Sequence, residues 1–343
     1  MNLEGSGSVK WRLAEVTSPL LAQQVPVVVA EDIPYFPRAD RFQTLSIYLP
    51  RTPETLDLVG TAAERLPAAA PGSAVPRYHV HIHGGAWRDP LLTSASIEPT
   101  VAHAFSGPAQ PITAVASLNY RVSQFPTHPS LPYDAVRDNH ADPAREAVHP
   151  DHVSDVLHGL ALLRSFGLTD RSYILSGHSC GACIAFQAIL QAPLHHGLEL
   201  PDAPCPAALV GLNGLYDLPE LTDGLGDSHE QLRQEYGTLL SNAFGTERTT
   251  WAAASPARFD PADIARRIRE GRAPRLIVLD QSSADMLVPM TQKERFAAHL
   301  GHVDGLRLVE GHRCSEGHAA PWERGDMIWE SLQDILRILH TEA

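Results

Sequence analysis

The chain contains 343 residues, of which 43% are hydrophobic and 20% charged, and this composition excludes a wholly disordered or fibrous protein. Its 27 basic and 40 acidic side chains give a formal charge of −13, and no Lys/Arg-rich run occurs, so nucleic acid and anionic membranes are not expected as partners. No apolar stretch of about 18 residues is present to span a bilayer. Residues 1–16 lack the apolar core of a secretory signal, and four cysteines are too few for a disulfide framework. We therefore expect a cytoplasmic protein.

Short apolar runs and helical patterns alternate along most of the chain. The apolar runs predict strands at 44–49, 78–83, 112–118, 172–176, 207–212, 276–280 and 306–310. Helical spacing predicts helices at 153–166, 182–190, 291–300 and 326–339. The Ala/Pro-rich segment 50–76 is expected to be an exposed connector. Strands that alternate with helices indicate an α/β protein whose central sheet is mostly parallel and flanked by helices.

Residues 213–272 interrupt this alternation with strand-poor sequence that has helical patterns at 230–240 and 261–270. An insertion late in such a sheet is placed to cover the carboxyl ends of the strands, where ligands bind. We therefore expect a single domain, 1–343, with a cap-like insertion at 213–272.

A candidate nucleophile, Ser179, lies in a G-x-S-x-G motif between a predicted strand and a predicted helix. This context is typical of a nucleophile elbow, in which Gly177 and Gly181 allow neighbouring backbone to come close. The hydroxyl would then stand at a helix N-terminus, which favours developing negative charge. Cys180 and Cys183 also form a C-x-x-C pattern, but a redox site is the weaker interpretation because the elbow already explains this segment.

A glycine-bearing H-G-G-x-W loop follows the strand predicted at 78–83. Such a loop supplies backbone N–H donors for a tetrahedral oxyanion. The expected donors are the N–H groups of Gly84, Gly85, Ala86 and Cys180. We expect His83 to shape the loop, whereas Trp87 could either line an aromatic pocket or pack in the core.

Histidines suggest two metal sites as alternatives. His79, His81 and His83 alternate along a strand and would share one face, but no carboxylate follows at ligand spacing. We expect His79 and His81 to be core residues bonded to backbone. The second alternative is a zinc site of His312, Cys314 and His318, which lacks a fourth spaced ligand. Surface or loop positions are expected for His149, His152, His195 and His196.

A serine nucleophile needs a histidine to accept its proton and a carboxylate to orient that histidine. In hydrolases with this elbow the acid and then the histidine follow the serine in the chain. Asp285 lies in a loop after the strand predicted at 276–280 and is favoured over Asp280, which stands at the strand end. Both His312 and His318 follow the next strand, and the spacing does not separate them.

Several stretches resemble the α/β-hydrolase-fold kynurenine formamidases (arylformamidases), and their fungal branch most of all. They are 81–90, 117–121, 149–156, 177–187, 211–219, 243–245 and 251–256. The last histidine of this family lies in an H-D-x-x-W-x-x-G pattern, which is similar to the sequence from His318 to Gly325, so the resemblance selects His318 over His312. Ala319 and Pro321 depart from that pattern.

The resemblance implies an α/β-hydrolase fold and a serine hydrolase that deformylates N-formyl-L-kynurenine to L-kynurenine and formate in tryptophan catabolism. Ser179 would be the nucleophile, His318 the base and Asp285 the orienting acid, without metal or other cofactor. The alternatives are a carboxylesterase, amidase or lactonase of a secondary-metabolite pathway, a metal-dependent hydrolase, and a non-catalytic binding module. The expected partner is a small aryl formamide or ester substrate. A homodimer is the oligomeric state that we consider for this protein.

Overall fold

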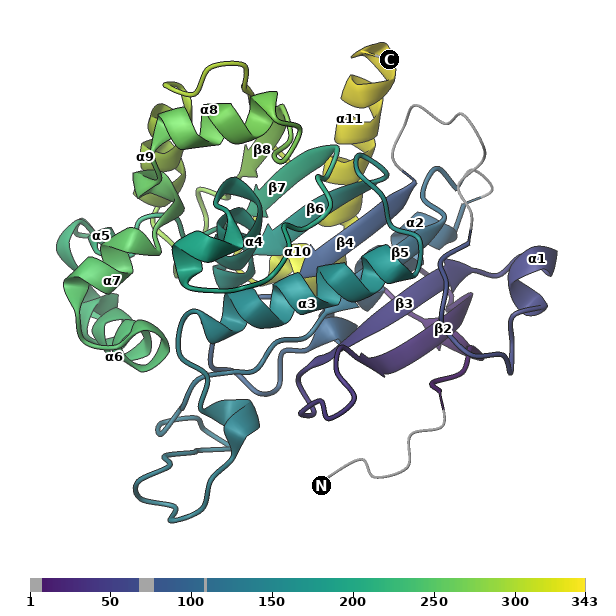
Figure 1. The fold of residues 1–343 in the computed structure, drawn as a ribbon, viewed down its shortest axis with the longest axis horizontal. Coiled ribbons are helices and arrows are strands. Elements are labelled where there is room, and N and C mark those ends of the chain that lie inside the picture. Colours follow the sequence, from purple (N-terminus) through teal and green to yellow (C-terminus); the bar gives the residue numbers. More distant parts are fainter. Residues whose placement is uncertain (1–7, 68–76, 108–109, 343) are drawn as a thin grey trace.

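The computed structural model describes residues 8–67, 77–107 and 110–342, and its centre is a mixed sheet of nine strands in the order β1-β2-β3-β5-β4-β6-β7-β8-β9 (Figure 1). The strands are β1 (Arg12–Val16), β2 (Val25–Pro34), β3 (Thr44–Pro50), β4 (Tyr78–Ile82), β5 (Ala114–Leu118), β6 (Tyr173–His178), β7 (Ala208–Leu212), β8 (Leu276–Asp280) and β9 (Arg307–Glu310). Strands β5, β4 and β6 to β9 pair in parallel, whereas β1, β2, β3 and β5 pair antiparallel. The predicted, mostly parallel sheet is confirmed.

Strand register brings the sequence motifs to one edge of the sheet. Ile82 at the end of β4 pairs with Gly177 of β6, and Leu212 at the end of β7 pairs with Asp280 of β8. Because parallel strands all end at the same edge, the segments that follow β4, β6, β7 and β8 meet there. This edge carries the candidate site.

Helices cover both faces of the sheet. One face is covered by α3 (Asp151–Ser165), α4 (Cys180–Leu190), α8 (Pro261–Arg269) and α9 (Thr291–Leu300), and the other by α2 (Glu98–Phe105) and α11 (Asp326–Glu342). Along β8, Ile277 and Leu279 face the first core, whereas Leu276 and Val278 face the second. Burial on both faces explains why the parallel strands read as uninterrupted apolar runs. None of the described helices is both long and apolar enough to cross a membrane.

The N-terminal part of the sheet differs from the sequence-based expectation. Strands β1 and β2 were not predicted, because β1 has one fully buried residue and β2 contains Pro26 and a register shift between Ala30 and Ile33. The connector 50–76 was predicted to be exposed, and most of residues 51–67 are, but two apolar side chains are not. A short helix, α1 (Pro53–Leu56), is followed there by Ala63 and Leu66, which are buried in the core. Residues 68–76 lie outside the described residues.

The segment between β7 and β8 is helical wherever it has regular structure. It contains α5 (Glu220–Asp223), α6 (Arg233–Phe244), α7 (Arg248–Ala253) and α8, with short 3-10 turns at Glu230–Leu232 and Pro256–Arg258. Figure 1 shows α5, α6 and α7 gathered beside one end of the sheet. Side chains from α6 reach the cavity described below.

Candidate active site

Ser179 occupies a sharp turn between β6 and α4. Its φ of 55° and ψ of −124° lie in a region that residues other than glycine rarely adopt. A Cβ atom at Gly177 would lie 2.3 Å from the carbonyl oxygen of Gly181, and one at Gly181 would lie 2.3 Å from that of His83. Both motif glycines are therefore required by close backbone packing. The amide of Ser179 donates to Leu212 O at 2.9 Å and ties the turn to β7.

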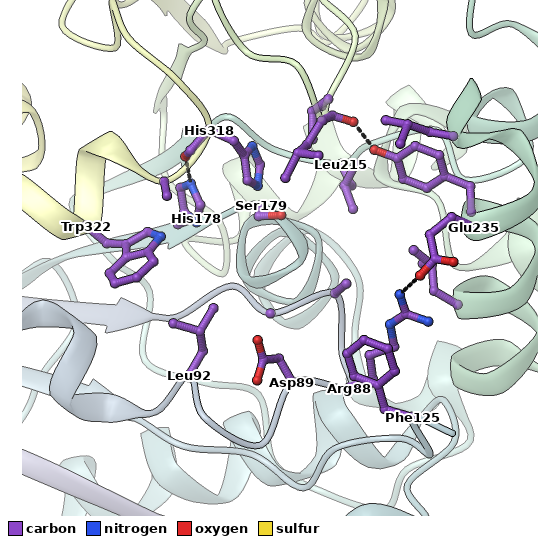
Figure 2. A pocket seen from close by; sticks show the side chains of 18 residues that line it. Arg88, Asp89, Leu92, Phe125, His178, Ser179, Leu215, Glu235, His318 and Trp322 are labelled. Carbon is purple, nitrogen blue, oxygen red and sulfur yellow. Dashed lines mark hydrogen bonds and ion pairs between the residues drawn. The ribbon is translucent and has the colours of Figure 1, made fainter. Parts of the chain in front are cut away.

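A cavity of about 380 Å³ opens beside Ser179 (Figure 2). Its walls are mainly apolar and include Phe125, Leu215 and Trp322. Residues 84–92 form one side, and α6 together with the segment before it forms another. The carboxyl edge of the sheet thus presents a serine to a mainly apolar cavity that is open to solvent on one side, as is usual for small-molecule sites in α/β proteins.

His318 and Asp285 lie together at this cavity. The His318 Nδ1 atom is 2.7 Å from Asp285 Oδ2, and the other oxygen, Oδ1, accepts hydrogen bonds from the amides of Leu287 (2.8 Å) and Val288 (2.9 Å). Burial raises the pKa of Asp285, but the hydrogen bond to His318 and the two amides outweigh it, so the pKa is lowered overall. With Nδ1–H donating to the carboxylate, Nε2 is left to accept a proton. Figure 2 shows the His318 ring directed towards Ser179.

The glycine-bearing loop after β4 has an unusual backbone. Gly85, Ala86 and Trp87 have φ values of 105°, 50° and 60°, and this strained conformation is held by contacts from elsewhere in the chain. The Tyr120 hydroxyl lies 2.9 Å from Gly84 O, and the Trp87 amide donates to the sulfur of Cys180 at 3.2 Å.

This loop lies directly against the elbow. A Cβ atom at Gly84 would be 3.2 Å from Ser179 Cβ, so only glycine allows this approach without displacement. Cys180 is the first residue of α4, and its N–H has no partner within the helix. The predicted donors Gly84, Gly85, Ala86 and Cys180 are therefore neighbours of Ser179.

Two residues that the sequence analysis missed hold the backbone of His318. His178 Nε2 lies 2.8 Å from His318 O, and Asn213 Nδ2 donates to the same oxygen at 3.3 Å. Burial lowers the pKa of His178 to about 3, so its ring is neutral and Nε2 is the protonated nitrogen. Asn213 also accepts a hydrogen bond from the amide of Ser282 at 3.0 Å, in the loop that carries Asp285. The only sequence signal was the position of both residues at strand ends.

The competing acid and base lie elsewhere. Asp280 accepts hydrogen bonds from the amides of Arg313 (2.8 Å) and Cys314 (3.2 Å) and so holds the turn after β9. His312 lines a second cavity, of about 400 Å³, together with Asp280 and Arg313. The structure therefore brings Ser179 and His318 to one cavity, with Asp285 bonded to His318, and places His312 and Asp280 at another cavity.

The histidines of β4 are core residues, as predicted, but with a different partner. Ser176 Oγ lies 2.7 Å from His79 Nε2 and 2.8 Å from His81 Nδ1, so a side chain of the adjacent strand bonds both rings and the expected backbone partner is wrong. His152 and His196 were expected at surface or loop positions. Both are buried, and the prediction is wrong for His152, which lies within α3. In the described ranges, no group of three or more His, Cys, Asp or Glu side chains is arranged to hold a metal ion.

The C-x-x-C pattern does not form a reactive thiol pair. Cys180 and Cys183 are free and fully buried, and burial raises the pKa of Cys180 to about 11 and that of Cys183 well above its usual value.

Trp87 is also fully buried and packs edge-on against Phe244, with ring centroids 5.0 Å apart. Of the two interpretations of Trp87, the one in which it packs in the core is therefore confirmed.

Comparison with known proteins adds sequence relatives and structural neighbours. No model of a known protein family matches the chain. A kynurenine formamidase-like hydrolase of Fusarium equiseti is 32% identical over 315 residues, covering 90% of this chain and 94% of the relative. A kynurenine formamidase of Aspergillus versicolor is 32% identical over 246 residues, covering 66% and 77%. One from Meyerozyma guilliermondii is 28% identical over 221 residues, covering 64% and 70%.

Solved structures that resemble this chain include esterases. A truncated carbohydrate esterase from gut microbiota superimposes with a TM-score of 0.58 at 17% identity, covering 91% of this chain and 96% of its own. Esterase B from Lactobacillus rhamnosis has a TM-score of 0.59 at 14% identity, covering 94% and 90%. At these identities the likeness shows the α/β-hydrolase fold alone, which agrees with the strand order.

Proposed function

The chain belongs to the kynurenine formamidase-like family of α/β-hydrolases, and from this premise we propose that it deformylates N-formyl-L-kynurenine to L-kynurenine and formate by a Ser179–His318–Asp285 triad. The observation that carries the proposal is the 2.7 Å hydrogen bond between His318 and Asp285 at the cavity that contains Ser179. A base oriented by a buried carboxylate beside a serine on an elbow is the arrangement that activates a hydroxyl.

In the first half of the reaction, Ser179 Oγ attacks the formyl carbon while His318 Nε2 takes the hydroxyl proton. The resulting oxyanion accepts hydrogen bonds from N–H groups of the Gly84–Ala86 loop and of Cys180, and each such donor lowers the barrier by about 3 kcal/mol. The C–N bond then breaks, and His318 returns its proton to the aniline nitrogen. An aniline leaves more readily than an alkyl amine because its lone pair delocalises into the ring.

In the second half, water attacks the formyl ester of Ser179, again with His318 as the base, and formate leaves as the serine is regenerated. Asp285 stabilises the imidazolium formed in each half. The lowered pKa of its carboxyl supports this role, because it keeps the group ionised near neutral pH.

The apolar cavity supports an aryl substrate. Leu215, Tyr236 and Leu239, all from the segment 213–272, contribute to its lining, and we propose that this insertion acts as the cap. The proposal includes a cytoplasmic location, the absence of a metal or other cofactor, and a homodimer as the assembly to be tested.

The test compares Ser179→Ala with the parent enzyme on N-formyl-L-kynurenine and on short acyl esters. The variant is expected to lose turnover of every substrate and covalent labelling by an organophosphate, and Ser165→Ala, which changes an exposed serine, should retain both. Labelling of Ser179→Ala would refute the nucleophile. A parent enzyme that prefers esters by orders of magnitude would replace the formamidase with a carboxylesterase.

A further inference from the structure

Three charged side chains line the otherwise apolar cavity, and the proposed triad uses none of them. Arg88 and Asp89 follow Trp87 in the loop after β4, and Glu235 lies in the first turn of α6. Figure 2 shows Asp89 directed into the cavity and Arg88 placed between Phe125 and Glu235. These residues form what we call the charged wall: Arg88, Asp89 and Glu235.

Arg88 is buried and incompletely paired. Its side chain is 6% exposed, and its guanidinium carbon lies 3.8 Å from the centroid of the Phe125 ring. One nitrogen, Nη2, donates to Glu235, but Nε and Nη1 have no hydrogen-bond partner within the described structure. Buried donors are nearly always paired in folded proteins, so an unpaired guanidinium at a cavity points to a ligand that completes it. A carboxylate fits best, because it accepts two parallel hydrogen bonds from arginine, here from Nη2 and one of the two unpaired nitrogens.

A ligand carboxylate can replace Glu235 in its contact with Arg88. The Glu235 side chain is 51% exposed, so it can move from Arg88 into water at little cost. Its carboxylate occupies the position that a ligand carboxylate would take on the guanidinium.

The carboxylate of Asp89 is suited to a cationic group of the ligand. Its Oδ1 accepts a hydrogen bond from the amide of Leu91 at 2.9 Å and lies 3.4 Å from His128 Nε2, and its side chain is 30% exposed. Its other oxygen, Oδ2, has no hydrogen-bond or ion-pair partner among the described residues. The amide of Asp89 donates to Gly85 O at 2.9 Å, which places Asp89 beside the loop proposed to hold the oxyanion. A carboxylate at this position opposes negative charge on the reacting oxygen unless a cation neutralises it.

We propose that the charged wall binds an α-amino acid group of the substrate, with its carboxylate on Arg88 and its ammonium on Asp89. A simple acid would leave Asp89 Oδ2 without a partner, and a simple amine would leave the two unpaired nitrogens of Arg88 as they are, whereas a zwitterion can bind to both side chains. This inference rests on the proposed function, because N-formyl-L-kynurenine carries such a group at the end remote from its formamide.

Calorimetric titration of the full chain tests the inference with three ligands that share one aryl ketone. L-Kynurenine has both charges, 3-(2-aminobenzoyl)propanoate lacks the ammonium, and 2′-aminoacetophenone lacks both. We expect the parent protein to bind L-kynurenine at least about tenfold more tightly than 2′-aminoacetophenone. Arg88→Met should weaken both carboxylate-bearing ligands about tenfold and leave 2′-aminoacetophenone unchanged. Asp89→Asn should weaken L-kynurenine alone.

The matched control is Arg145→Met. Arg145 is likewise buried, stacks over Tyr133 at 4.9 Å and has an unpaired Nε, but it does not line the cavity. Its loss should change none of the three affinities. Arg88→Lys, which keeps the charge, should restore part of the affinity for the two carboxylate-bearing ligands.

Equal affinity of the parent protein for all three ligands, or no binding at all, would overturn the inference. So would an Arg88→Met variant that weakens the three ligands equally, since that result would indicate a structural role. Deformylation is measured separately: a protein that binds L-kynurenine through Arg88 but does not cleave N-formyl-L-kynurenine refutes the reaction and leaves the amino acid subsite standing.

Discussion

Mild acid is expected to destabilise this protein, because five histidines are held neutral in its interior. His79, His81, His83, His152 and His178 are at most 2% exposed. Burial lowers the pKa of His79, His152 and His178 to about 3, that of His83 to about 4, and that of His81 well below its usual value. In the unfolded chain each ring has a pKa of about 6.5.

The sign of the effect follows from these two sets of values. Below about pH 6.5 the unfolded chain binds a proton at each ring and the folded chain does not, so stability falls as the pH falls. At pH 5.5 each histidine costs about 1.4 kcal/mol, and the five together cost about 7 kcal/mol. This is comparable with the whole net stability of a typical domain, about 5 to 15 kcal/mol. Above about pH 7 the effect is absent.

Urea unfolding followed by tryptophan fluorescence at pH 7.5, 6.5 and 5.5 measures this loss. His152→Gln should reduce the loss of unfolding free energy between pH 7.5 and 5.5 by about 1.4 kcal/mol, whereas His302→Gln, at an exposed histidine, should leave it unchanged. An unfolding free energy that differs by less than about 1 kcal/mol between pH 7.5 and 5.5 would refute the reasoning, because the interior would then take up protons as readily as the unfolded chain.

Three further outcomes are expected. Asp285→Asn should lower kcat about 10⁴-fold with little change in melting temperature, because the neutral amide no longer stabilises the imidazolium; retention of a tenth of the activity would contradict the triad. Gly181→Ala should destabilise the fold by about 3 kcal/mol, since its Cβ atom would lie 2.3 Å from His83 O, and Gly237→Ala, at an open helical site, should not; calorimetric melting of both variants decides. Dialysis against a chelator should leave the rate unchanged, and a loss that zinc restores would favour metal chemistry.

Structural elements that are determined by residues close together in the sequence could be predicted from the sequence. The elbow at Ser179 needs glycines two residues before and two residues after the serine, and the five-residue motif at 177–181 shows both of them. The parallel strands are buried on both faces and so appear as apolar runs. By contrast, β2 is interrupted by Pro26 and a register shift, and its pattern does not alternate regularly.

Contacts between residues far apart in the sequence could not be predicted in this way. Arg88 and Glu235 are 147 positions apart and meet only because α6 lies over the loop after β4. The hydrogen bond from His178 to His318 O spans 140 positions. Spacing also left His312 and His318 equivalent, since which of them meets Asp285 depends on the path of the chain after β9; only the family resemblance separated them.

The cavity has two walls of different origin in the chain. The wall that carries Ser179, His318 and the glycine-bearing loop is built on strand ends that are buried in the core of the sheet. The facing wall comes from α6 and the turn before it, which contribute Leu232 and Leu239 from a segment outside the sheet. Substitutions of Leu232 and Leu239 can therefore alter which acyl or aryl group fits while the residues of the proposed triad stay in place. In evolutionary terms, part of the choice of substrate is encoded in α6, apart from the strand ends that carry the proposed triad, and can change there while the reaction is kept.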